Sequence, residues 1–277
     1  MKSSQKNSIG LEIIGLLLSL IVLIPVYFVV VNSFKTVNDA ADMLLTWPHK
    51  FQLSQIIANY KQVFVDGNII SALINSTIIT TCAVAVIIFA SAMAGYVLQR
   101  KSGKLSTFFS FIVLSGLIVP PAIVPTFWVL KLLHLNGTFL SVILMQAAIG
   151  FSFSTLLYTA FCKTVSKEID EAAFIDGCSG MKHFFKIIFP LLTPVTTTIG
   201  LIQCIIIWND FTIPMYFLSS ASSTTLPVTV FMFFGKYVSS WNLVFADVVL
   251  IALPVTILYL LAQRFIIEGM AAGAIKG

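Results

Sequence analysis

The longest charge-free stretch of the sequence, residues 69–98, restricts the possible folds more than any other feature. A run of that length exceeds the roughly 20 apolar residues that a helix needs to cross a bilayer core of ~30 Å. Its apolar residues follow one another and do not alternate with polar ones, so the stretch predicts a transmembrane helix. Five further apolar runs reach a similar length.

Together these runs predict an all-α polytopic membrane protein with six transmembrane helices in a single domain, 1–277. The predicted spans are approximately 11–33, 69–98, 105–131, 138–162, 188–218 and 243–264. Composition agrees, because only 10% of residues are charged, against about 25% in a typical soluble domain. The first run is too long for the core of a signal peptide, and no small-residue cleavage site follows it.

Basic residues predict the orientation, because loops on the cytoplasmic side are enriched in Lys and Arg. If the N-terminus is cytoplasmic, 11 of the 16 Lys and Arg residues lie inside and five lie outside. The outer five are Lys35, Lys50, Lys61, Lys131 and Lys236. We therefore expect both termini in the cytoplasm, with the protein in contact with membrane lipid. No basic patch interleaved with aromatic residues indicates nucleic-acid binding.

The four cysteines predict neither disulfides nor a metal site. Cys82 and Cys204 lie inside predicted spans, and Cys162 and Cys178 lie at or in the same cytoplasmic loop. None falls in an outer loop, and their spacing is wrong for zinc. We expect them to be small packing residues and expect no metal or cofactor.

The loop between the fourth and fifth runs, residues 163–187, is too charged to span a membrane. Ser166 can cap the start of a helix, and Gly177 can end it. Three acidic residues would occupy the first turn, where the helix dipole favours anions; they are Glu168, Asp170 and Glu171. This pattern predicts a short helix with a small-residue face at Ala172 and Ala173.

A second helix is predicted after Gly177. Its apolar stripe has helical spacing and comprises Met181, Phe184, Phe185, Ile188 and Phe189. Lys182, His183 and Lys186 would occupy the opposite, polar face. We expect this helix to lie along the inner membrane surface and to enter the fifth span at Pro190.

The same loop contains a spaced motif. It reads Glu171-Ala172-Ala173, three residues, Gly177, nine residues, then Ile187-Ile188-Phe189-Pro190. This resembles the EAA motif of ABC-importer permeases, Glu-Ala-Ala-x3-Gly-x9-Ile-x-Leu-Pro, with Phe189 in place of Leu. The resemblance implies a coupling loop whose helix docks in a cleft of an ATPase subunit. The implied docking residues are Glu171, Ala172, Ala173, Asp176 and Gly177.

Other segments are similar to the carbohydrate-importer subfamily, on the side of the maltose-transporter G-type subunit. They are Asn75-Ser76, Tyr96 with Arg100, Leu135-Asn136-x-Thr138, Trp208-Asn209-Asp210, Thr225-Leu226-Pro227 and the tail 269–277. The resemblance implies a sugar permease of the bacterial cytoplasmic membrane, without catalytic activity of its own. It also implies four kinds of partner: a second homologous permease, two ATPase subunits, an external solute-binding protein and the sugar. Gly103-Lys104 lacks the rest of a P-loop, so ATP hydrolysis requires another chain.

Prolines and two carboxylates mark candidate positions inside the spans. Pro120 and Pro121, with Pro125 close behind, should break or bend the third span, either as a packing kink or as part of the substrate pathway. Asp210 and Asp247 are the only charges well inside a predicted span, and such residues are functional candidates.

Three roles remain open for Asp210. With Trp208 and Asn209 it could contact a sugar, it could be a structural partner of neighbouring spans, or it could relay protons in a secondary carrier. The last role defines the alternative function, a proton-coupled carrier that uses Asp210 and Asp247; a membrane scaffold is a further class. Because both deep charges are acidic, we expect a neutral oligosaccharide as substrate.

Overall fold

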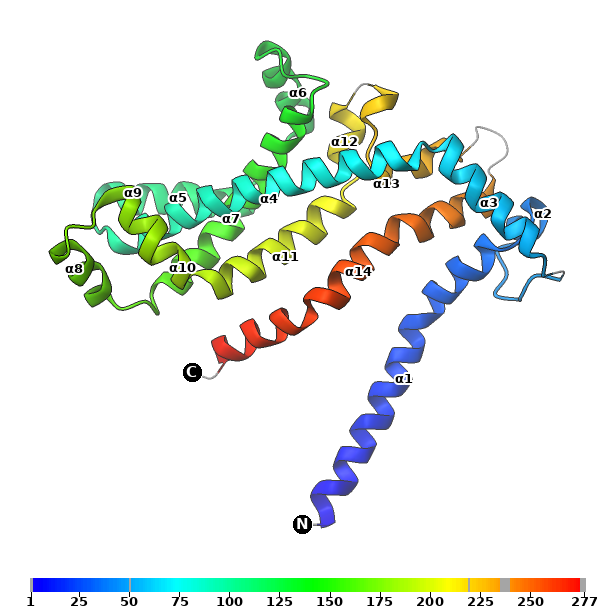
Figure 1. Ribbon diagram of the computed structural model, residues 1–277, viewed down its shortest axis with the longest axis horizontal. Coiled ribbons are helices and arrows are strands. Elements are labelled where there is room, and N and C mark those ends of the chain that lie inside the picture. The colour runs from blue at the N-terminus through cyan, green and yellow to red at the C-terminus, as the bar shows by residue number, and fades with distance from the viewer. Residues whose placement is uncertain (1, 50, 219, 235–239, 275–277) are drawn as a thin grey trace. The chain divides into compact units, whose positions relative to one another are not determined.

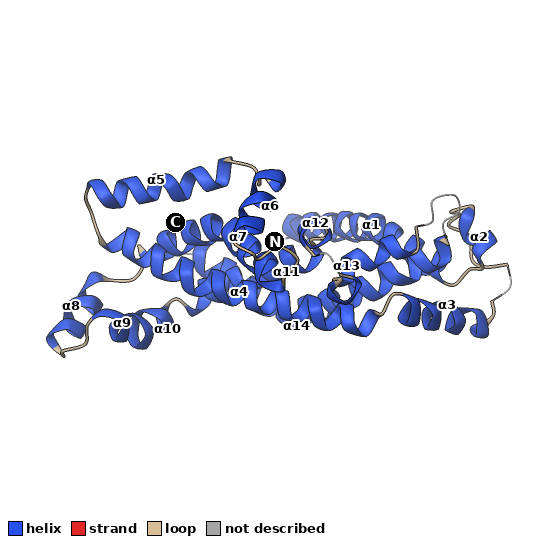
Figure 2. Ribbon diagram, turned by 90° about the horizontal axis from the view of Figure 1, so that it is seen from above, coloured by secondary structure: helices blue, strands red, loops and turns tan. Residues whose placement is uncertain are grey.

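A computed structural model describes residues 2–49, 51–218, 220–234 and 240–274. These residues form helices joined by turns and loops, with no strand among them (Figure 2). The all-α class predicted from the sequence is therefore confirmed for this part of the chain. The longer helices are α1 (Lys2–Ser33), α3 (Leu53–Asp66), α4 (Ile69–Arg100), α5 (Lys104–Ile118), α6 (Ile123–Leu132), α7 (Phe139–Cys162), α8 (Lys167–Ile175), α11 (Thr193–Asn209) and α14 (Trp241–Ala274).

Shorter elements connect them. They are α2 (Val37–Ala41), α9 (Gly180–His183), the π-turn η1 (Phe184–Ile188), α10 (Phe189–Leu191), α12 (Thr212–Phe217), η2 (Ala221–Ser223), α13 (Leu226–Thr229) and η3 (Val230–Met232). Lys50, Lys236 and Lys276, which entered the orientation prediction, lie outside the described residues, as does the end of the tail, 275–277.

Four described helices are long and apolar enough to cross a membrane: α1 from Glu12, α4, α7 and α14 as far as Leu261. Two further pairs of helices reach that length only if each bent pair counts as one span. The membrane-protein class is thus supported with four to six spans, and the count of six stays a prediction.

The predicted third span is broken at its prolines. α5 ends at Ile118, α6 begins at Ile123, and the two axes differ by 119°. Val119 adopts an extended conformation (φ −80°, ψ 118°), because a residue before proline avoids the helical region. The sequence prediction of a break or bend at Pro120 and Pro121 is correct, and both prolines are exposed.

The predicted fifth span, 188–218, is not one helix. A bend of 79° at Leu192 separates α10 from α11. Pro194 has no N–H to pair with the carbonyl of Pro190, and the Thr193 hydroxyl donates to that carbonyl instead at 2.6 Å. α11 then ends at Asn209, and extended backbone at Asp210 separates it from α12.

The chain divides into two compact units. Unit 1 comprises Met1–Ala72 and Leu226–Pro254, and unit 2 comprises Leu73–Thr225 and Val255–Gly277. Each unit combines segments that are far apart in sequence, and α4 and α14 each contribute to both (Figure 1).

Unit 1 is held by buried amides near the end of α1. The Asn59 amide donates to the carbonyls of Ser33 at 2.9 Å and Lys35 at 3.0 Å. Its oxygen accepts from Gln55 Nε2 and Asn242 Nδ2, both at 2.9 Å. Every polar atom of the Asn59 side chain is therefore paired, which ties α1, α3 and α14 together within this unit.

Lys35 is a second buried group of unit 1, and it lies outside the membrane-spanning segments. Its ammonium donates to Asn32 Oδ1 at 3.0 Å and to the Leu44 carbonyl at 2.7 Å. Burial lowers the pKa of Lys35, while Asp39 and Asp42 oppose that shift. The ammonium is thus retained in the interior by the oxygens that surround it.

In unit 2, α7 packs against α5, α11 and α12. Small residues allow α4 to approach α7 closely, since a Cβ on Gly95 would lie 2.6 Å from Tyr158 Cβ and 2.9 Å from the Thr159 nitrogen. Ser91 and Gly95, four residues apart on α4, are small residues of the kind that lets membrane helices approach closely. Ile87, Val142 and Ile199 form part of the buried core between α4, α7 and α11.

Candidate functional site

The site is the loop between α7 and α11, and its first part is α8. The Ser166 hydroxyl accepts from the Glu168 N–H at 3.2 Å and so caps the start of the helix. At the other end, Gly177 has φ +73°. Its N–H donates to the Phe174 carbonyl at 3.1 Å, and the Cys178 N–H donates to the Ala173 carbonyl at 2.8 Å. This is a Schellman motif, which favours glycine because of its positive φ, so both predicted helix ends are correct.

The two sides of α8 differ. Asp170 and Ala173 are buried, whereas Glu171, Ala172 and Asp176 are exposed. Ala172 and Ala173 therefore do not share one face, contrary to the expectation of a small-residue face. Of the two adjacent acidic residues, Asp170 is buried and engaged within the chain, whereas Glu171 is exposed and available to another molecule.

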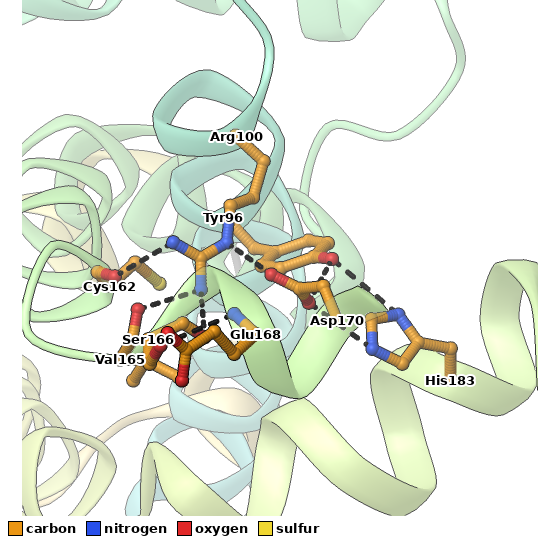
Figure 3. A network of polar contacts seen from close by, with 8 residues as sticks. All are labelled: Tyr96, Arg100, Cys162, Val165, Ser166, Glu168, Asp170 and His183. Carbon is orange, nitrogen blue, oxygen red and sulfur yellow. Dashed lines mark hydrogen bonds and ion pairs between the residues drawn. The ribbon is translucent and has the colours of Figure 1, made fainter. Parts of the chain in front are cut away.

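Asp170 is the centre of a buried polar cluster that also contains Tyr96, Arg100 and His183 (Figure 3). The carboxylate Oδ2 lies 2.7 Å from Arg100 Nε. Oδ1 accepts from the Tyr96 hydroxyl at 2.9 Å and lies 3.2 Å from His183 Nε2. Side chains from α4 and α9 thus meet at one carboxylate of α8.

Tyr96 and Arg100 reach Asp170 together because residues four apart share a face of a helix. Arg100 Nη2 also donates to the carbonyl of Val165 at 2.9 Å, and Nη1 lies 3.5 Å from that of Cys162. One guanidinium therefore holds α8 and the end of α7. Removing one partner of a buried ion pair costs about 3–5 kcal/mol.

A second helical segment follows Gly177 as predicted, beginning at Gly180, but it differs from the prediction in detail. Its middle is a π-turn, which shifts the register, so that Phe184 and Ile188 are buried while Met181 and Phe185 are exposed. His183 is buried beside Asp170 at 2% exposure, and its predicted place on a polar, solvent-facing side is wrong. The sequence offered no local signal for this contact.

The candidate pathway residues around Asp210 do not converge. Trp208 is buried, and its indole N–H has no hydrogen-bond partner among the described residues. Asn209 is exposed and donates to the carbonyl of Ile205, one turn earlier. The structure thus places these neighbours in different environments at the end of α11.

Asp210 itself has internal partners for both oxygens. Oδ2 accepts from Gln146 Nε2 at 2.6 Å, and Oδ1 accepts from the Thr212 N–H at 2.9 Å. The Ile213 N–H adds a longer contact to Oδ2 at 3.4 Å. The carboxylate therefore joins α7 to the start of α12.

Asp247 of unit 1 is fully buried, and its Oδ2 accepts from the Thr229 hydroxyl at 2.9 Å. Within the described part of the chain, no three His, Cys, Asp or Glu residues are grouped closely enough to hold a metal ion.

Comparison with known proteins places this architecture in a family. The family described as "Binding-protein-dependent transport system inner membrane component" matches residues 86–271. The chain belongs to this family. That match includes α8, the Asp170 cluster and the bend before α11.

Curated relatives match almost the whole of this permease. It is 34% identical over 271 residues to the probable starch degradation products transport system permease protein AmyC of Thermoanaerobacterium thermosulfurigenes, with 96% of each chain covered. It is 32% identical to the melibiose/raffinose/stachyose import permease protein MelC of Bacillus subtilis, over 92% of this chain and 91% of that protein.

A solved structure has the same fold. It is the crystal structure of a bacterial ABC transporter involved in the import of the acidic polysaccharide alginate. The TM-score is 0.80 with 19% identity, over 95% of this chain and 98% of the other. The chain is thus a multi-pass ABC-importer permease that works with other components of such a system.

Proposed function

We propose that this permease imports sugars across a bacterial cytoplasmic membrane, with both termini in the cytoplasm. Its partners would be a second, homologous permease, two ATPase subunits and an external solute-binding protein. The proposal is supported by family membership and by relatives whose names refer to oligosaccharides or starch products. Energy would come from the ATPase subunits.

α8 would be the docking helix for an ATPase subunit. The main support for this role is that one side of α8 is buried against the rest of the permease and the other side is exposed. The exposed residues are Glu171, Ala172, Asp176 and Gly177. Ile175, the last residue of α8, is an apolar residue with an exposed fraction of 86%. A capped helix with one acidic, apolar-tipped side is suited to a cleft in a partner protein.

Substitutions on the exposed side test the docking role. Glu171→Lys reverses the charge of that side, and Gly177→Asp forces a side chain onto a φ of +73°. Each is expected to abolish uptake and to weaken co-purification of the ATPase, while the permease still inserts into the membrane. Glu168→Gln is the matched control, because this residue is also an exposed acid of α8. Normal uptake and normal assembly in both variants would refute docking.

The proposed substrate is a neutral oligosaccharide. Lys131 and His134 lie at or just beyond the end of α6. The two charges that the sequence predicts inside spans are both acidic: Asp247 lies within the candidate span of α14, and Asp210 follows the last residue of α11. An anion 4 Å from a carboxylate is disfavoured by about 4 kcal/mol at an effective dielectric constant of ~20. A protein of this fold takes part in importing alginate, an acidic polysaccharide, so the fold alone does not determine whether the substrate is charged or neutral. The proposed preference for a neutral sugar therefore depends on Asp210 and Asp247.

A proton-coupled carrier is not favoured. Members of this family belong to binding-protein-dependent systems, and both oxygens of Asp210 accept hydrogen bonds from within the chain. A carboxylate that relays protons needs access to water or to a second titratable group along a path.

A further inference from the structure

α4 has a side-chain anchor near each of its ends, and both anchors lie in unit 2. Near its start, the buried amide of Asn75 donates to the carbonyls of Ser222 and Thr224, both at 2.9 Å. At its end, Arg100 and Tyr96 bind Asp170 of α8. One helix therefore holds both the docking loop and the serine-rich loop 220–225.

The stretch of α4 between the anchors is suited to act as a rod. It contains no proline, and its hydrogen bonding as an α-helix continues from Ile69 to Arg100. The 25 steps along the helix from Asn75 to Arg100 span roughly 37 Å at 1.5 Å per residue, more than the ~30 Å of a hydrocarbon core. The two anchored loops thus lie at opposite ends of a membrane-length helix.

The covalent connections of α8 to its neighbouring helices in the chain are less direct than its side-chain contact with α4. Towards α7, the chain passes through the linker 163–166, whose carbonyls are held by Arg100 itself. Towards α11, it passes through the π-turn η1 and the 79° bend at Leu192. Such interruptions of the regular helix are places where a helix bends. The ion pair with α4 therefore joins α8 directly to an uninterrupted helix of unit 2.

We infer that α4 carries the movement of α8 to the loop 220–225, with Arg100, Asp170 and Asn75 as positioning residues. Arg100 and Asp170 join the helix to α8, and Asn75 joins it to the distant loop. The inference rests on the proposed docking of α8 and adds the route by which docking reaches the other side of the membrane.

The contact between α4 and α8 is tested by measuring how much sugar is transported per ATP hydrolysed by the complete complex in proteoliposomes. Asp170→Asn and Arg100→Gln are each expected to lower this ratio by about tenfold, in the upper range for coupling residues, while ATP hydrolysis continues. The double variant should lose no more than either single one, because the two residues form one contact. Lys101→Gln is the control, being an exposed cation next to Arg100.

A probe at the far end separates transmission from local folding. In a variant whose native cysteines are replaced by serine, Ser222→Cys provides a single thiol for an environment-sensitive fluorophore. The fluorescence is then followed when ATP binds the complex. The signal change should be lost in Asp170→Asn and also in Asn75→Ala, which lies far from α8. Asp170→Glu, which keeps the charge, should retain part of it.

The outcomes distinguish this inference from the docking proposal. If Glu171→Lys prevents assembly but Asp170→Asn keeps a normal transport ratio and a normal signal at position 222, docking stands and the α4 route is wrong. A parallel loss of ATP hydrolysis and transport in Asp170→Asn would indicate a purely structural contact and would also overturn the inference. If Glu171→Lys has no effect, the docking proposal itself fails.

Discussion

Two acidic residues next to each other, Asp170 and Glu171, have opposite roles in this permease. Asp170 is buried against Arg100 at 2.7 Å, and Glu171 is exposed. Asp210 likewise has its oxygens occupied by Gln146 and the first N–H groups of α12. At the scale of single residues, the positions of Asp170 and Asp210 are explained by the hydrogen-bond and ion-pair donors that surround their carboxylates.

Asp210→Ala should therefore destabilise the protein without changing substrate affinity. It leaves Gln146 Nε2 and two backbone N–H groups without their acceptor, and a buried donor without a partner costs about 1–3 kcal/mol. We expect a lower thermal unfolding temperature in detergent and an unchanged KM for uptake. Asn209→Ala, which removes only a contact within α11, serves as the control. A raised KM with unchanged stability would instead assign Asp210 to the sugar.

Prolines accompany the two sharpest changes of helix direction described in unit 2. Pro120 and Pro121 separate α5 from α6 at 119°, and Pro194 accompanies the 79° bend before α11. At that bend, the Thr193 hydroxyl takes the place of the missing backbone donor. At the scale of elements, these breaks let one apolar run become two helices that point in different directions.

Pro194→Ala should open the bend at Leu192. The new N–H can pair with the Pro190 carbonyl, so the helix is expected to continue from α10 into α11. Spin labels at positions 186 and 206 should then move apart by about 5 Å, from a rise of 1.5 Å per residue. Uptake should fall, because α8 is carried to a new position. Thr197→Ala alters only a hydroxyl within α11 and should leave the distance unchanged; an unchanged distance in Pro194→Ala would contradict this account.

Among the described residues, α1 exposes a long run of apolar side chains, and the sequence contains no P-loop motif. These side chains extend from Ile13 to Tyr27, and the Gly-Lys pair at residues 103 and 104 lacks the rest of a P-loop. At the scale of the molecule, the permease is expected to depend on lipid and partner subunits for cover, and on an ATPase for energy.

Uptake should follow ATP hydrolysis and not the proton gradient. In proteoliposomes that contain the full complex, a non-hydrolysable ATP analogue is expected to stop uptake, and a protonophore is expected to leave it intact. Gradient-driven uptake by vesicles that lack the ATPase would revive the carrier alternative.

The complex should also prefer neutral sugars. Labelled neutral and acidic oligosaccharides of matched size, supplied with the native solute-binding protein, are expected to differ in uptake rate in favour of the neutral one. The physical reason is the repulsion between an anion and the deep carboxylates in a low dielectric. A clear preference for the acidic sugar would show that cations of the second permease control selection.

The sequence alone was sufficient for features that depend on neighbours along the chain. Apolar runs predicted the long helices, Ser166 and Gly177 predicted both ends of α8, and Pro120 predicted the break after α5. The spaced Glu-Ala-Ala and Gly motif led to the family. Caps, turns and proline breaks are local, because their hydrogen bonds join residues at most five apart.

Only the tertiary structure decided which side chains meet. Asp170 and Arg100 are 70 positions apart, Asn75 and Ser222 are 147 apart, and nothing local distinguishes the buried His183 from the exposed Lys182. The π-turn moved the apolar stripe of the second helix, and the breaks at Leu192 and Asp210 divided the fifth run. Such features follow from packing of distant helices, where burial and long-range pairing override the periodicity of a single segment.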